Sequence, residues 1–149
     1  MKRQIFILMF CLLCLALPAA AQKGVNGTWE WKGTPDKNRS QNVVWLDIKQ
    51  TGSKVKGGIT IWAVNPDEGE EGADSPLTPF IGTVVGKVIT IEFDAEDVSP
   101  LDGTPVKYVR RKGGAPNTAT LRLVGGKLEF TQTKGSMGEG YPRKFTLSR

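Results

Sequence analysis

The chain has 149 residues, a formal net charge of +5, no histidine and only two cysteines. The absence of histidine excludes the Ser-His-acid and Cys-His catalytic arrangements and every histidine-ligated zinc site. The length fits one domain preceded by a short targeting segment.

The N-terminus has the pattern of a secretory signal peptide. Two basic residues follow the initiator methionine, an apolar run covers residues 5–17, and three alanines end at Ala21. Pro18 interrupts this stretch before it reaches the roughly 20 apolar residues that a spanning helix needs. We therefore expect residues 1–21 to be cleaved and residues 22–149 to form one secreted or periplasmic domain that is not held in a membrane.

Cleavage would also remove Lys2, Arg3 and both cysteines. The remaining chain would carry no thiolate for catalysis or metal binding, and its mildly basic charge argues against a dedicated nucleic-acid binder. A lipoprotein signal fits less well, because Leu13 rather than a small residue precedes Cys14. We expect a free protein that uses no metal and no other cofactor.

The apolar residues after the signal follow a period of two, which is typical of strands. Every second residue of 44–49 is aliphatic, and the alternation resumes at Ile59 and Ile61 after a turn at Gly52 and Ser53. The resulting hairpin pairs Val44 with Ile61 and Leu46 with Ile59. All four side chains then share one face.

Two further hairpins sort their residues in the same way. Turns at Gly86-Lys87 and Gly125-Gly126 are short and glycine-containing, as tight hairpins require. The inner pairs are Val84 with Ile89, Gly82 with Ile91, Phe80 with Phe93, Leu123 with Leu128 and Leu121 with Phe130, and Arg122 faces Glu129 on the outside. A slip of one residue would turn each apolar set toward the solvent.

Additional strands are expected over residues 27–32, 106–111 and 143–148, which gives eight or nine strands in total. The strand over residues 106–111 has the weakest pattern. No sustained helical spacing follows the signal, and glycines and prolines interrupt the chain every few residues. We predict an all-β fold in which an antiparallel up-and-down meander of about eight strands closes into a barrel, because closure removes exposed strand edges.

The first predicted strand opens with Gly27, Thr28 and Trp29, which resembles the Gly-x-Trp signature of lipocalins and avidin-like barrels, the calycin group. In that group a basic residue near the end of the last strand packs over the tryptophan, and Arg149 occupies that place here. The resemblance implies a lipocalin-like or avidin-like barrel in which Gly27, Trp29 and Arg149 are structural. It also implies a small apolar or amphipathic ligand in the barrel mouth. The chain lacks the lipocalin disulfides and the second Thr-Asp-Tyr motif.

The outer face of the first predicted hairpin is a second candidate binding surface. Trp45 and Trp62 lie diagonally there, and indole rings beside polar groups suit the stacking and orienting of sugar rings. A loop that covers the two rings is an equally good explanation. The candidate ligand-binding residues are Trp31, Trp45, Asp47, Thr60 and Trp62.

Carboxylates offer the remaining route to catalysis, because Asp47, Glu92 and Asp94 could meet across a sheet as a glycosidase pair does. The predicted registers place Glu92 and Asp94 on the outside, where ordinary solvated carboxylates lie. The acidic loop over residues 65–74 misses the calcium-binding EF-hand spacing, and the glycine-rich stretch 135–140 is expected to be a flexible connection.

We therefore expect a non-catalytic binding protein for a small apolar or amphipathic molecule. The alternatives are a module that recognises glycans or a partner protein through its outer aromatic face, and a carboxylate-based hydrolase.

Overall fold

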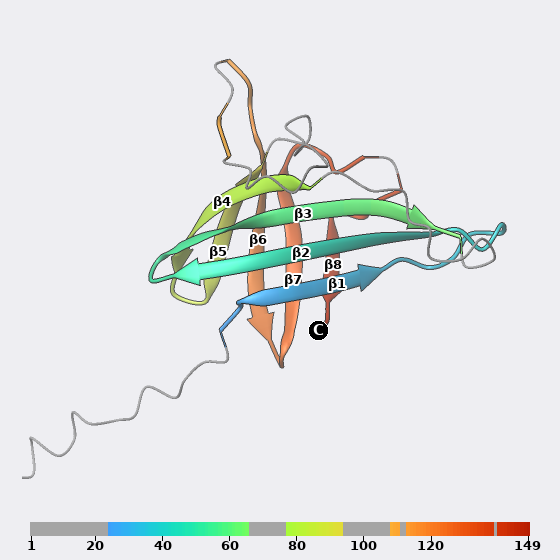
Figure 1. The fold of residues 1–149 in the computed structure, drawn as a ribbon, viewed down its shortest axis with the longest axis horizontal. Coiled ribbons are helices and arrows are strands. Elements are labelled where there is room, and N and C mark those ends of the chain that lie inside the picture. Colours follow the sequence, from blue (N-terminus) through green and yellow to red (C-terminus); the bar gives the residue numbers. More distant parts are fainter. Residues whose placement is uncertain (1–23, 66–76, 94–107, 111–112, 139) are drawn as a thin grey trace, which may run out of the picture.

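The computed structural model describes residues 24–65, 77–93, 108–110, 113–138 and 140–149 (Figure 1). The expected signal peptide and the acids of the loop over residues 65–74 lie outside these ranges. No helix within the described ranges is long and apolar enough to cross a membrane.

Within the described ranges, eight strands form one antiparallel sheet in which each strand pairs with its neighbours in sequence. They are β1 (Gly27–Lys32), β2 (Gln41–Thr51), β3 (Lys54–Val64), β4 (Thr78–Val85), β5 (Val88–Phe93), β6 (Asn117–Val124), β7 (Lys127–Lys134) and β8 (Lys144–Leu147). The sheet curls until its two edges meet (Figure 1). There the amide of Glu30 donates to the carbonyl of Ser148 at 2.8 Å, and the reverse bond is also 2.8 Å. The predicted all-β meander is therefore confirmed as a nearly closed barrel.

The three predicted hairpins are confirmed in their registers, including every inner pair and the outer pair of Arg122 with Glu129. The turn between β6 and β7 shows why the sequence specifies them so well. Gly125 and Gly126 both have positive φ angles, 56° and 80°. Such turns match the natural twist of the two strands, and glycine enters them without steric strain.

The strand expected over residues 106–111 is wrong for the part that the structure describes, because Tyr108–Arg110 has no strand conformation. The reason is that the sheet has no gap at this position. Strand β5 pairs directly with β6 from Val88 to Phe93, so no further strand fits between them. The segment instead lies beside β5 and contacts the side chain of Glu92.

The inner face of the barrel is filled by its own side chains. Trp29, Phe80, Phe93 and Phe130 are each at most 1 % exposed, and Phe130 stacks on Phe145 with ring centroids 4.6 Å apart. These rings belong to one continuous apolar cluster that draws on all eight strands. The described part of the interior is therefore a packed core.

The end of the barrel that holds the three tight turns is closed by Trp29 and Arg149. The guanidinium carbon of Arg149 lies 4.3 Å from the centre of the indole. Arg149 Nη2 donates to the carbonyls of Gly24 and Asn26 at 2.7 and 2.9 Å, and Trp29 Nε1 donates to the Val25 carbonyl at 2.7 Å. The last residue, the indole and the segment before β1 are thus held together.

The opposite end is covered by the connection between β7 and β8, which was expected to be flexible. Instead, it is attached at several points and buries Met137. The bonds run from the Ser136 amide to Asn117 Oδ1 at 2.9 Å, from Asn42 Nδ2 to the Gly140 carbonyl at 3.1 Å, and from the Tyr141 hydroxyl to the Trp62 carbonyl at 3.2 Å. Burial also raises the pKa of Tyr141. In its described residues the connection is a cap on the barrel.

Candidate functional site

The aromatic pair on the outer face of β2 and β3 lies as the register predicts. Trp45 is opposite Thr60, and Trp62 is diagonal to it. The two indoles meet edge to face, with centroids 4.2 Å apart and an interplanar angle of 78°. Trp45 is 44 % exposed, whereas Trp62 is half-buried. This geometry is favourable for aromatic pairs and leaves one ring accessible to a ligand.

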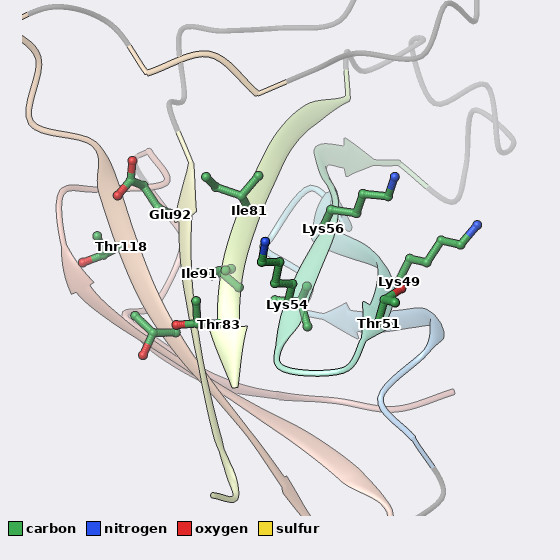
Figure 2. Close-up of a pocket in the computed structure, with 12 residues that line it drawn as sticks. Lys49, Thr51, Lys54, Lys56, Ile81, Thr83, Ile91, Glu92 and Thr118 are labelled. Atoms are coloured by element: carbon green, nitrogen blue, oxygen red, sulfur yellow. The ribbon is translucent and has the colours of Figure 1, made fainter. Parts of the chain in front are cut away.

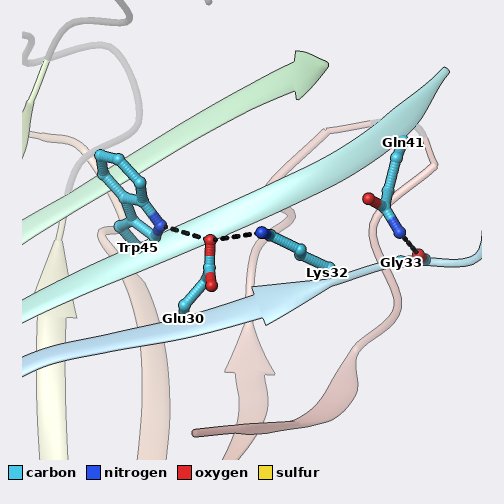
Figure 3. A network of polar contacts seen from close by, with 5 residues as sticks. All are labelled: Glu30, Lys32, Gly33, Gln41 and Trp45. Atoms are coloured by element: carbon cyan, nitrogen blue, oxygen red, sulfur yellow. Dashed lines mark hydrogen bonds and ion pairs between the residues drawn. The ribbon is translucent and has the colours of Figure 1, made fainter. Parts of the chain in front are cut away.

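The ring of Trp45 is fixed by its neighbours on β1. Its Nε1 donates to Glu30 Oε1 at 3.0 Å, and the same oxygen lies 3.2 Å from Lys32 Nζ (Figure 3). Asp47 is exposed farther along β2 on the same face. The outer surface therefore holds a positioned indole within a charged surrounding.

Trp31 is separated from the other four candidate residues. It lies on the inner side of β1, where its ring is 4.9 Å from that of Phe145 and 6.4 Å from that of Tyr141. Trp31 faces inward because it lies two residues after Trp29, on the same side of the strand. The structure thus places Trp31 in the apolar packing beneath the cap, while Trp45, Asp47, Thr60 and Trp62 lie outside.

The described residues form a groove on the outer face, and its volume is about 690 Å³. Figure 2 shows three lysines on its β2–β3 side, Ile81 between, and Glu92 and Thr118 on the opposite side. The lining residues are Lys49, Thr51, Lys54, Val55, Lys56, Ile81, Gly82, Thr83, Thr90, Ile91, Glu92 and Thr118. Among these residues, sequence reasoning singled out only Glu92, as one of three carboxylates considered for hydrolysis.

The groove is built by two rows of outward-facing residues that cross the strands. The first row runs from Lys49 on β2 through Lys56, Ile81 and Glu92 to Thr118 on β6. The second row consists of Thr51, Lys54, Thr83 and Thr90. Side chains that are directly opposite on one face of a sheet lie within contact range. The rows therefore present cations at one end, a branched aliphatic side chain in the middle and hydroxyls throughout.

The acidic side of the groove is already neutralised. Glu92 Oε1 accepts a hydrogen bond from the Tyr108 hydroxyl at 2.9 Å and lies 3.1 Å from Arg110 Nε. The side chain of Glu92 is 26 % exposed. Because its charge is paired with Arg110, the three lysines dominate the field inside the groove.

Asp47 and Glu92, two of the three carboxylates considered for hydrolysis, are not brought together. Asp47 on β2 and Glu92 on β5 are separated by three strand-to-strand steps, about 14 Å at the usual spacing. Paired catalytic carboxyls lie roughly 5–9.5 Å apart. Asp94 lies outside the described residues. Among those residues, no three potential ligands of the His, Cys, Asp and Glu types gather as a metal site would require.

A second hollow of about 370 Å³ lies at the tight-turn end, beside the segment that carries Val25. Its apolar lining includes Val84, Ile89 and Leu123, and its rim includes Gln50 and Lys87. It is smaller than the outer groove and lies next to the Trp29–Arg149 closure. The mouth at the opposite end, where the resemblance places a ligand, is covered by Met137 and Tyr141.

Comparisons with known proteins add no further constraint on the site. The chain matched no protein family, no curated protein and no solved structure.

Proposed function

We propose that this protein is a secreted or periplasmic, non-catalytic binding protein of lipocalin-like build. Its ligand is a small amphipathic molecule, which lies in the outer groove across β2–β6 rather than inside the barrel. The observation that carries this proposal is the groove itself, because its size and mixed lining occur beside an interior that is already filled with side chains.

The dimensions and chemistry of the groove support a small ligand. Its volume of about 690 Å³ lies within the usual range of roughly 300–1,000 Å³ for ligand pockets. Ile81 is 45 % exposed at its centre, and the aliphatic stems of the lysines extend the apolar surface on one side. An apolar body and a polar end are therefore both accommodated.

Native mass spectrometry of the protein purified gently from its own secreting cells tests this proposal directly. We expect a bound species of defined mass, which would identify the ligand class. Binding of the neutral probe N-phenyl-1-naphthylamine, followed by its fluorescence, tests the groove without knowledge of the natural ligand. Failure to retain any small molecule, together with failure to bind the probe, would contradict the proposal.

Replacement of Ile81 by Glu should weaken binding of N-phenyl-1-naphthylamine about tenfold, because the apolar contact at the centre of the groove is lost. The matched control is Val124→Glu. Val124 is 47 % exposed and lies outside the groove lining, so this change adds the same charge without touching the site. Equal probe affinities of the two variants would place the probe elsewhere.

The exposed indole of Trp45 favours a second candidate function, the recognition of glycans by the outer aromatic face. Its ring is accessible and held by Glu30, and polar side chains lie on the same face. Sugar rings stack through their C–H faces on such an indole, and nearby carboxylates and hydroxyls orient them.

For this second function, Trp45→Ala should abolish retention on a glycan array, since it removes the stacking surface. Trp45→Tyr should retain part of the signal. Quenching of tryptophan fluorescence by the array-selected sugar provides an independent measurement. If Trp45→Ala binds the same glycans as the unchanged protein, recognition does not involve this face.

A further inference from the structure

We propose that the outer groove selects anionic amphiphiles as single molecules, and that Lys49, Lys54 and Lys56 hold the carboxylate or phosphate head group. This inference rests on the proposed function and names the ligand class of the same groove.

The first argument is the arrangement of like charges. Lys49 and Lys56 are directly opposite each other on β2 and β3, and Lys54 lies on the same outer face two residues from Lys56. Like charges in directly opposite positions destabilise a sheet. All three lysines are exposed, and among the described residues none of them has an ion-pair partner. An anion bound between them would relieve this repulsion.

The second argument is the polarity of the groove. Lys56, Ile81 and Glu92 follow one another on β3, β4 and β5. The lysines and Glu92 therefore lie on opposite sides of the aliphatic centre, about 10 Å apart across two strand spacings (Figure 2). A negative head group is attracted to the lysine side, and it gains no such attraction beside Glu92, whose carboxylate is already paired with Arg110. The chain of the ligand then crosses Ile81 toward β5 and β6.

The third argument concerns the state of the ligand. Ile81 lies between two sides whose long side chains, Lys56 and Glu92, extend from neighbouring strands (Figure 2). A single alkyl chain can enter between them and contact Ile81. A planar membrane surface would meet the lysine ends and leave the apolar centre unused. The lining therefore favours a monomeric amphiphile over a lipid bilayer.

The test compares dodecanoate, dodecyl phosphate, dodecanol and dodecylammonium below their micelle concentrations, by displacement of N-phenyl-1-naphthylamine from the purified protein. We expect both anions to bind at least about tenfold more tightly than dodecanol, and dodecylammonium to bind more weakly than dodecanol. Lys54→Gln combined with Lys56→Gln should lower the ratio of anion affinity to dodecanol affinity several-fold, because two of the three cations beside the head group are removed. Lys127→Gln combined with Lys134→Gln, two exposed lysines of β7 outside the groove, is the matched control.

Each outcome separates the two proposals. Equal binding of anions and dodecanol would overturn the anion preference and leave the groove as a binding site. Loss of anion preference in the β7 control as well would assign the effect to general charge and also overturn it. Co-sedimentation with phosphatidylglycerol vesicles that depends on Lys54 and Lys56, without binding of monomeric dodecanoate, would assign the lysines to a membrane surface. Failure of all four amphiphiles to bind would overturn the proposed function itself.

Discussion

Trp29→Ala should lower the free energy of unfolding by about 3–5 kcal/mol, the usual cost of removing a large aromatic ring from a packed core. Trp29 is 1 % exposed, and its loss would also leave the Arg149 guanidinium without its stacking partner. For a domain of this size the melting temperature should fall by roughly 10–20 °C. Guanidinium denaturation followed by circular dichroism measures the change in stability, and a thermal scan measures the midpoint.

Trp45→Ala provides the control for this experiment, because it removes the same side chain from the opposite face of the sheet. Trp45 is 44 % exposed, so its removal should cost no more than about 1 kcal/mol. The large difference between the two variants follows from the burial of Trp29 and from its contact with Arg149. If both substitutions destabilise the protein equally, Trp29 does not close a packed barrel end.

Arg149→Lys separates the contribution of the positive charge to this closure from that of the planar guanidinium group. Lysine retains the positive charge but lacks the planar group that stacks on indole and donates two directed hydrogen bonds. The bonds to Gly24 and Asn26 attach the last residue of the chain to the segment before β1. The contact therefore joins sequence-distant segments at the place where β1 and β8 meet.

Gly27 contributes to the same closure through its backbone. Its φ angle is 110°, a conformation that residues with a side chain rarely adopt. The space around it is open, because an added Cβ would have no neighbour within 4 Å. The backbone conformation at the start of β1 therefore explains why a glycine occupies this position, and a lack of space does not.

The hairpins could be predicted from the sequence because their determinants are local. Alternation fixes which residues face inward, and a two-residue glycine turn fixes the register, as the pair of Leu121 with Phe130 illustrates. A one-residue error would expose a whole apolar row. The alternation of apolar residues and the turn thus predict the same register.

The groove could not be predicted in the same way, because it depends on pairings across long connections. Lys56 lies beside Ile81 only because β3 pairs with β4, and Glu92 lies beside Thr118 only because β5 pairs with β6. Residues 65–77 and 94–116 connect these strands, far more than the two residues of a tight turn. The local pairs of the groove were implicit in the predicted hairpins: Lys49 with Lys56 in the first, and Ile81 with Glu92 in the second.

The cap between β7 and β8 was misinterpreted for a different reason. Its glycines suggested flexibility, yet Gly135, Gly138 and Gly140 have positive φ angles of 75°, 116° and 82°. These conformations turn the chain so that Met137 and Tyr141 meet the barrel end. Glycine content alone does not distinguish a mobile segment from one that uses glycine to fold tightly.

Gly57→Ala should destabilise the protein by about 2–4 kcal/mol, because an inward Cβ has no room at this position. It would overlap the backbone carbonyl oxygen of Asp47 on β2 and would lie 2.6 Å from Cζ of the buried ring of Phe80. A backbone atom in a paired strand cannot rotate away. Relief would require separation of β2 from β3 or displacement of Phe80 from the core, and guanidinium denaturation would measure the resulting loss of stability.

Gly58→Ala is the matched control, since it adds the same methyl group one residue later on the outer face. There the Cβ would overlap the side chain of Leu77, which is 40 % exposed, and we expect this side chain to move toward the solvent. We expect a cost below about 1 kcal/mol. Equal losses at the two positions would mean that the inner and outer faces of β3 are equally constrained, which would contradict a filled interior. The expected difference therefore tests the packed barrel on which the assignment of binding to the outer surface depends.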